Sequence, residues 1–172
     1  MSAEPHAQPI EQVDRMVRVF DEIARTRMAG LPMVNPALQI EAVGFEQHGD
    51  ENGELSAFVG ILITPWFMNL MWLPRAGVLA LPVGTKRVHQ VGNEAFEFIG
   101  GEAEGLGPYE ACSLFSPMFQ FTDPEAARAT AQAVLDLLRT PVPVPEPALK
   151  APEPVPARRA FLFGRSAAGE RG

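Results

Sequence analysis

The run from Leu55 to Leu73 contains no charged residue, and it constrains the fold more than any other part of the chain. Its length is close to that of a transmembrane helix, but Pro65 and Asn69 interrupt it. The residues before Pro65 are rich in Phe, Val and Ile, which favour a strand over a helix. We therefore predict a buried strand from Leu55 to Thr64 followed by an apolar loop, and no stable insertion into a membrane.

Apolar periodicity predicts two helices, one on each side of the strand-rich part of the chain. Apolar residues recur at three- and four-residue steps from position 10 to about position 29, and Gly30 and Pro32 end that helix. Asp123 and the proline after it start a second amphipathic helix, which we expect to run to about Arg139.

Further strands are expected around the central one. Segments bounded by turn residues predict them at 38–46, 77–81, 86–91, 95–99 and 108–115. The first of these is expected to form a hairpin with the 55–64 strand across the polar turn 48–53. The sequence therefore predicts an α+β fold, a mainly antiparallel sheet flanked by an N-terminal and a C-terminal helix.

The composition changes abruptly after residue 139. Prolines at 141, 143, 145, 147, 152, 154 and 156 favour an extended, semi-rigid spacer. We divide the chain into a disordered N-terminus (1–9), one folded domain (10–139) and a disordered Pro-rich linker with a basic tail (140–172). The tail holds five basic and three acidic residues, a charge of +2. Because the whole chain carries -7, the part before the tail carries -9. This excess of acid argues against a nucleic-acid partner.

Cys112 is the only cysteine, which excludes an internal disulfide and a Cys/His metal site. A catalytic Cys112 would need His48 or His89 beside it to activate the thiol, and a buried, inert cysteine is the alternative. The histidines are scattered, so we predict no metal, no cofactor and no enzymatic activity. Residues 1–9 lack the apolar segment of a secretory signal, and cytoplasmic residence is expected.

Two apolar segments are candidates for contact with a partner protein. The first, 64–74, holds both tryptophans, and the second, 112–121, contains Pro117, which disfavours a central strand there. Met and Trp side chains can adapt to a client that is not yet folded, although the same residues could fill the core. We expect some to face inward and some outward. The candidate client-binding residues are Trp66, Phe67, Met68, Asn69, Met71, Trp72, Met118 and Phe119.

Five segments also carry a family resemblance: 28–32, 34–38, 41–45, 60–70 and 112–119. They resemble the HybE family of nickel-iron hydrogenase assembly chaperones, also called HupJ or HoxT, and the string Thr-Pro-Trp-Phe-Met-Asn-Leu is highly specific. The resemblance implies binding of an immature hydrogenase small subunit, including its twin-arginine export signal, and delay of export until cofactors are inserted. The large subunit and other maturation proteins are further candidate partners. The alternative function is a structural scaffold within a maturation complex.

Some members of that family carry a fused rubredoxin with paired CxxC iron ligands. This sequence has no CxxC pair, so iron binding is not expected.

The tail contains Arg158, Arg159, Ala160, Phe161 and Leu162, which resemble the core of a twin-arginine signal. Their place near the C-terminus, with no apolar region after them, excludes an export signal. We interpret the segment as a mimic of the client that occupies the signal-binding groove in cis until a real signal displaces it. An accidental basic tail is the alternative.

Overall fold

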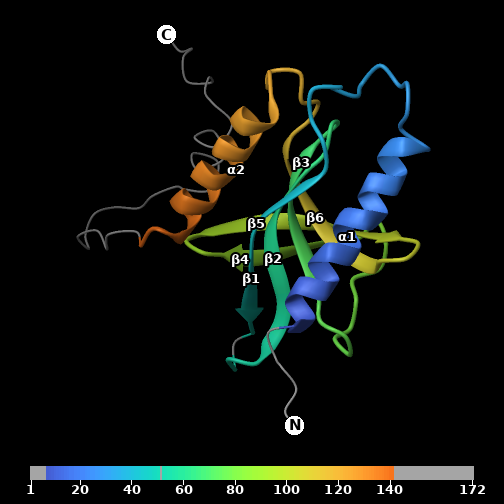
Figure 1. The fold of residues 1–172 in the computed structure, drawn as a ribbon. Helices are drawn as coiled ribbons and strands as arrows, with labels where there is room; N and C mark the ends of the chain where they lie inside the picture. The colour runs from blue at the N-terminus through green and yellow to red at the C-terminus, as the bar shows by residue number, and fades with distance from the viewer. Residues whose placement is uncertain (1–6, 51, 142–172) are drawn as a thin grey trace.

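Two helices and six strands make up the part of the chain that the computed structural model describes, residues 7–50 and 52–141 (Figure 1). Their order confirms the predicted α+β architecture. In chain order the elements are α1 (Ala7–Arg25), β1 (Glu41–Gly49), β2 (Leu55–Ile63), β3 (Met68–Pro74), β4 (Lys86–Val91), β5 (Glu94–Ala103), β6 (Gly107–Phe115) and α2 (Pro124–Arg139).

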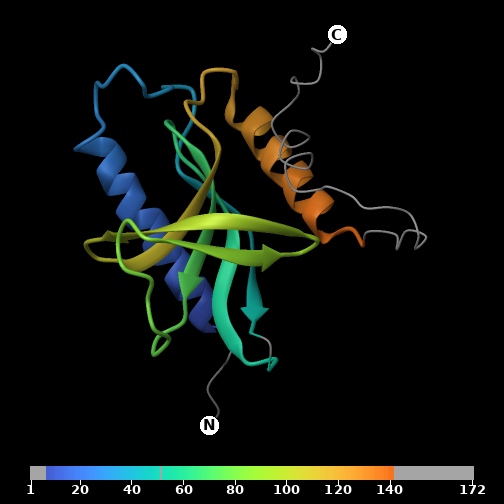
Figure 2. The same cartoon turned by 180° about the vertical axis from the view of Figure 1, so that it is seen from behind.

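The six strands form one antiparallel sheet in the order β1-β2-β3-β6-β5-β4. The sheet is strongly curled, so that the β4–β5 hairpin crosses over β1 and β2 (Figures 1 and 2). This brings the two edge strands together, and His48 Nε2 on β1 donates to the Gln90 carbonyl on β4 at 3.0 Å. We call the line along which β1 and β4 face each other the seam.

Each face of the sheet is covered by one helix. On one face, α1 inserts Met16 and Phe20 against Phe58, Leu62 and Met71. On the other, α2 packs against β1 and β2 with its buried residues: Ala127, Ala131, Val134, Leu135 and Leu138. The central strands β2 and β3 are thus buried on both faces. This burial explains why the run 55–73 holds no charged residue. An unpaired charge there would lower the free energy of unfolding by roughly several kcal/mol, the desolvation penalty of a buried ion.

Both ends of α2 are fixed by hydrogen bonds. At its start the Asp123 carboxylate accepts from the Ala126 N–H at 2.8 Å, which confirms the predicted cap. At its end the Asn93 amide donates to the carbonyls of Leu137 and Thr140, both at 2.8 Å. The β4–β5 turn therefore holds the end of α2, and the described chain stops at residue 141 beside it.

The structure corrects several predicted boundaries. Residues 68–74, which we expected to be an apolar loop, form β3, because side chains on both of its faces pack into a core. The predicted strand 77–81 is part of a long loop, in which Gly77 has a φ of 91°. The first strand begins at 41 instead of 38, and α1 ends at 25 instead of 29.

The predicted disordered segments fall mostly outside the described residues. Residues 7–9 belong to α1, which corrects the expected N-terminal boundary. Residues 1–6 and 142–172, with the segment 158–162, are outside the described part, so the domain division stays a prediction. Neither described helix is long and apolar enough to cross a membrane.

Candidate functional site

Three loops meet at one end of the molecule, at the top of Figure 1: residues 26–40, the β2–β3 turn at 64–67, and residues 116–123. Buried Asn35 joins them. Its side-chain amide donates to the carbonyls of Met118 and Phe121, both at 2.9 Å, and its backbone N–H donates to the Pro65 carbonyl at 2.8 Å. We call this part of the molecule the loop end.

The β2–β3 turn is held by Thr64, which is fully buried. Its hydroxyl oxygen accepts from the N–H groups of Trp66 at 3.1 Å and Phe67 at 2.9 Å. The Phe67 ring then lies edge-on to Phe20 of α1, with centroids 6.0 Å apart. Trp66 and Phe67 are therefore half-buried, each fixed in position by the turn.

The loop end also exposes large apolar side chains. The exposed fraction is 54% for Phe119, 44% for Met33 and 40% for Leu31. Together with Trp66 and Phe67, these three residues form what we call the loop-end surface. Of the residues chosen from the sequence, Trp66, Phe67 and Phe119 stand on the loops that meet here. Leu31 and Met33 were missed, although Leu31 stands in a segment that carries the family resemblance and Met33 lies between two such segments.

The other predicted client-binding residues lie inside the molecule. Met68, Met71 and Met118 have no exposed surface, because β3 is a central strand and Met118 lies in the core on the α2 side. These three side chains are thus among those that face inward. Trp72 is 7% exposed, and Asn69 is half-buried, with an Oδ1 atom that has no hydrogen-bond partner in the described structure. Client contact by these five residues stays a prediction.

A second candidate site lies at the seam, around the buried carboxylate of Glu110, which is 1% exposed. Its two oxygens accept from His89 Nε2 at 2.6 Å and from Arg87 Nη2 at 2.8 Å. Burial raises the pKa of this carboxyl, but the hydrogen bonds and charges of His89 and Arg87 outweigh it, so the pKa lies below its ordinary value. Glu110 is therefore a buried, ionised group with two fixed partners.

Trp72 lies beside this ion pair, between the two histidines. Its ring stacks on His89 with centroids 3.5 Å apart, and the His48 ring lies 4.6 Å from it on a tilted plane. A cavity of about 470 Å³ opens here, lined also by Val78 and Leu79 of the β3–β4 loop. No local sequence pattern predicted this site, because His48 and His89 reach Trp72 only when the sheet curls.

Cys112 is half-buried on β6. Cys112 packs against the core on the α2 side of the sheet, while His48 and His89 interact at the seam. Within residues 7–50 and 52–141, no cluster of three His, Cys, Asp or Glu side chains could hold a metal ion.

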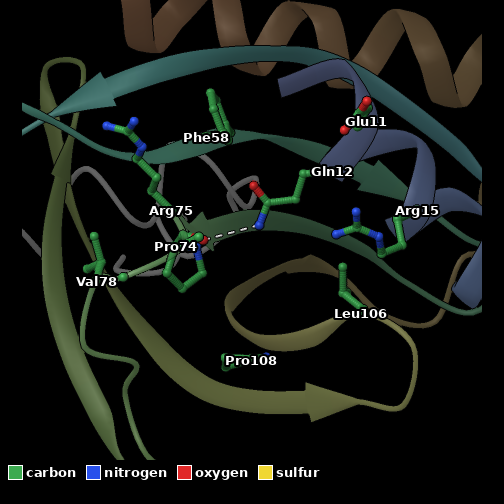
Figure 3. A pocket seen from close by; sticks show the side chains of 11 residues that line it. Glu11, Gln12, Arg15, Phe58, Pro74, Arg75, Val78, Leu106 and Pro108 are labelled. Carbon is green, nitrogen blue, oxygen red and sulfur yellow. Dashed lines mark hydrogen bonds between the residues drawn. The ribbon is translucent and has the colours of Figure 1, made fainter. Parts of the chain in front are cut away.

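A further cleft of about 470 Å³ lies beside the first half of α1 (Figure 3). Gln12 Nε2 crosses it and donates to the Pro74 carbonyl at 3.1 Å. Glu11, Arg15 and Arg75 line its exposed walls. With no buried ionised group among its lining residues, this cleft offers less chemistry than the seam.

The comparison with known proteins settles the family. Residues 11–164 match the family model described as "[NiFe]-hydrogenase assembly, chaperone, HybE". The chain belongs to the HybE family. Protein HoxT of Cupriavidus necator is 47% identical over 163 residues, which cover 91% of this chain and 90% of the relative. Hydrogenase expression/formation protein HupJ of Bradyrhizobium diazoefficiens is 41% identical, over 93% of this chain and 92% of the relative.

A solved structure confirms the fold of this HybE family member. The solution structure of HybE from Escherichia coli aligns with a TM-score of 0.58 at 24% identity, over 91% of each chain. The resemblance inferred from five short segments is thus confirmed at the level of family and fold, and the chain stands among [NiFe]-hydrogenase assembly chaperones.

Proposed function

We propose that this chain is a non-enzymatic chaperone that holds the immature small subunit of a nickel-iron hydrogenase in the cytoplasm. In this proposal it also binds the twin-arginine signal of that subunit and delays export until cofactors are inserted. Family membership supports hydrogenase assembly as the setting. The loop-end surface is the single structural observation that carries the binding role. The large subunit and other maturation proteins are further candidate partners.

The loop-end surface suits a partner that is not completely folded. Phe119, Met33 and Leu31 are exposed, and each Å² of apolar surface that a client covers contributes about 25 cal/mol. Met33 can also adapt its shape, because its side chain is flexible and polarizable. Asn35 and Thr64 hold the backbone beneath these residues, so little conformational entropy is lost when a client binds.

A binding role requires no catalytic group, and the surroundings of Cys112 support this part of the proposal. Its side chain packs against the core, so Cys112→Ala should leave client binding unchanged, within about 1 kcal/mol of packing energy. Loss of client maturation in a folded Cys112→Ala protein would instead favour a cysteine-dependent enzyme.

The proposed client is tested by co-purification. The full chain should retain a hydrogenase small-subunit precursor from cell extract, and should retain less of the same subunit after its twin-arginine segment is deleted. The mature hydrogenase should contain none of the chaperone. Equal recovery of both subunit forms would remove signal binding from the proposal. Persistence of the chain in the mature enzyme would favour a structural scaffold.

A further inference from the structure

The seam leaves one backbone edge of β4 available to a further strand. In the sheet order β4 is an edge strand that pairs with β5. The Gln90 carbonyl points away from β5, since it accepts from His48 across the seam. Alternate residues of an antiparallel strand present their backbone groups to the same side, so Val88 and Lys86 also face the seam. An extended segment can therefore add to β4 by backbone hydrogen bonds.

The cavity at the seam lies directly beside this edge and offers apolar walls. Val88 and Gln90 of β4 line it together with Trp72 and Leu79. Leu79 is 87% exposed and its neighbour Val78 is 41% exposed, so apolar surface is open to solvent at this cavity. A strand added to β4 would direct every second side chain into this space. The site thus selects a segment with apolar residues as well as an extended backbone.

The charges around the cavity favour a basic segment. Asp50 lines the mouth, and Glu54 follows in the same β1–β2 turn, where both side chains are exposed. On the opposite side the charge of Arg87 is matched by Glu110 at 2.8 Å, and Lys86 is paired with Glu97 at 3.7 Å. The carboxylates of the turn are therefore the charges left to attract an incoming cation.

This chain supplies a segment of the required chemistry. Residues 158–163 read Arg-Arg-Ala-Phe-Leu-Phe, two cations followed by three large apolar side chains. The described chain ends at residue 141 beside the β4–β5 turn, because Asn93 holds the end of α2 there. From that turn to Val88 is about 10 Å along β4. The 16 residues 142–157 reach about 50 Å even at the rise of polyproline II, so they span the whole seam.

We propose that the seam cavity binds an extended segment with paired arginines followed by aromatic residues, and that residues 158–163 occupy it in cis. The arginines pair with the carboxylates of the β1–β2 turn, and the apolar residues cover Leu79 and Trp72. Because the tether holds the segment at an effective concentration on the order of millimolar, a competing segment must bind more tightly than the tail does. This proposal rests on the proposed function only in one respect, that the competing segment is the twin-arginine signal of the small subunit.

Photo-crosslinking in the full-length chain tests the position of the tail. Benzoylphenylalanine replaces Leu79, whose exposure makes the change harmless to folding, and in a matched control it replaces Leu137, which is 46% exposed on α2. The Leu79 variant should crosslink within one chain to the peptide that contains 158–163, at least 5-fold more than the control. Equal yields, or no crosslink to the tail, would overturn the proposal. Crosslinks between two chains would overturn occupation in cis.

A binding measurement tests the competition without any hydrogenase. A fluorescent peptide of residues 157–165 is titrated into the full-length chain and into the full-length triple variant Arg158→Ala, Arg159→Ala, Phe161→Ala. The variant should bind the peptide at least 10-fold more tightly, because its own tail no longer competes. Equal affinities would contradict the proposal and leave the assembly function untouched. Loss of peptide binding on Leu79→Asp in the triple variant is expected, and retention would exclude the seam cavity as the site.

Discussion

Trp72 and His89 stack with ring centroids 3.5 Å apart and planes 8° from parallel. Trp72 stands on the central strand β3 and His89 on the edge strand β4, so the contact crosses the inside of the curled sheet. His89 also donates to Glu110 on β6. One histidine on β4 therefore contacts residues of β3 and β6 across the inside of the curl.

Replacing this histidine should destabilise the protein strongly. His89→Ala removes the stacked ring and one of the two partners of a buried carboxylate, and we expect the free energy of unfolding to fall by about 3 kcal/mol. Urea denaturation measures the change. Val88→Ala, at the neighbouring 63%-exposed position, is the control and should cost less than about 0.5 kcal/mol. Similar costs for both variants would show that the His89 contacts do not stabilise the seam.

The ionisation of Glu110 makes stability depend on pH in a definite direction. Its pKa in the folded state is below the ordinary value of 4.5, so its contribution is complete above pH 4.5 and is lost as the pH falls through the folded pKa. Glu110→Gln should lower the free energy of unfolding at pH 7 by about 3 kcal/mol. The difference between variant and wild type should shrink below pH 4.5. A difference that stays constant from pH 7 to pH 3 would contradict this account.

The loop end should become less stable when the side chain of Asn35 can no longer donate hydrogen bonds. Asn35→Asp keeps the oxygen that accepts from Ala37, but places a carboxylate against the carbonyls of Met118 and Phe121. We expect a loss of about 2–4 kcal/mol and faster proteolytic cleavage at 116–123. Gln39→Ala, an exposed position on the same loop, is the control and should change neither. Unchanged proteolysis in Asn35→Asp would show that the loops are held by other contacts.

Gly92 and Gly53 both have positive φ, but only a side chain at Gly92 would collide with the end of α2. A Cβ at Gly92, where φ is 62°, would lie 2.1 Å from the Leu138 carbonyl oxygen, whereas at Gly53, where φ is 83°, it would meet open space. Gly53→Ala should therefore cost about 1 kcal/mol from strain alone. Gly92→Ala should cost at least about 2 kcal/mol more, since α2 must move away from the turn. Thermal denaturation of both variants measures the difference, and equal costs would contradict the described contact.

The elements that could be predicted from the sequence are those encoded by local signals. The Asp123-Pro124 pair fixes the start of α2 through a side-chain cap, and the β-branched run before Pro65 fixes β2. Strand β3 could not be predicted, because burial on both faces removes the alternation of apolar and polar residues. Its pattern is equally typical of an apolar loop, which is how we interpreted it.

The sites were predictable only in part, for a physical reason. Trp66, Phe67 and Phe119 stood out because they are large apolar residues next to prolines. Leu31 and Met33 join them through Asn35, whose partner Met118 is 83 residues away in the chain. The seam depends on a contact between His48 and Gln90, 42 residues apart, which forms only after the sheet has curled. Neither pairing leaves a local signal in the sequence.

The central claim is that the loop-end surface binds the immature hydrogenase small subunit, and a dissociation constant tests it most directly. The double variant Leu31→Asp, Phe119→Asp changes only exposed side chains, and Leu137→Asp on α2 is the matched control. Against a purified small-subunit precursor, the double variant should bind at least ~30-fold more weakly than wild type, since two apolar contacts are replaced by desolvated charges. The control should bind as wild type does. A double variant that keeps wild-type affinity while remaining folded would contradict the account.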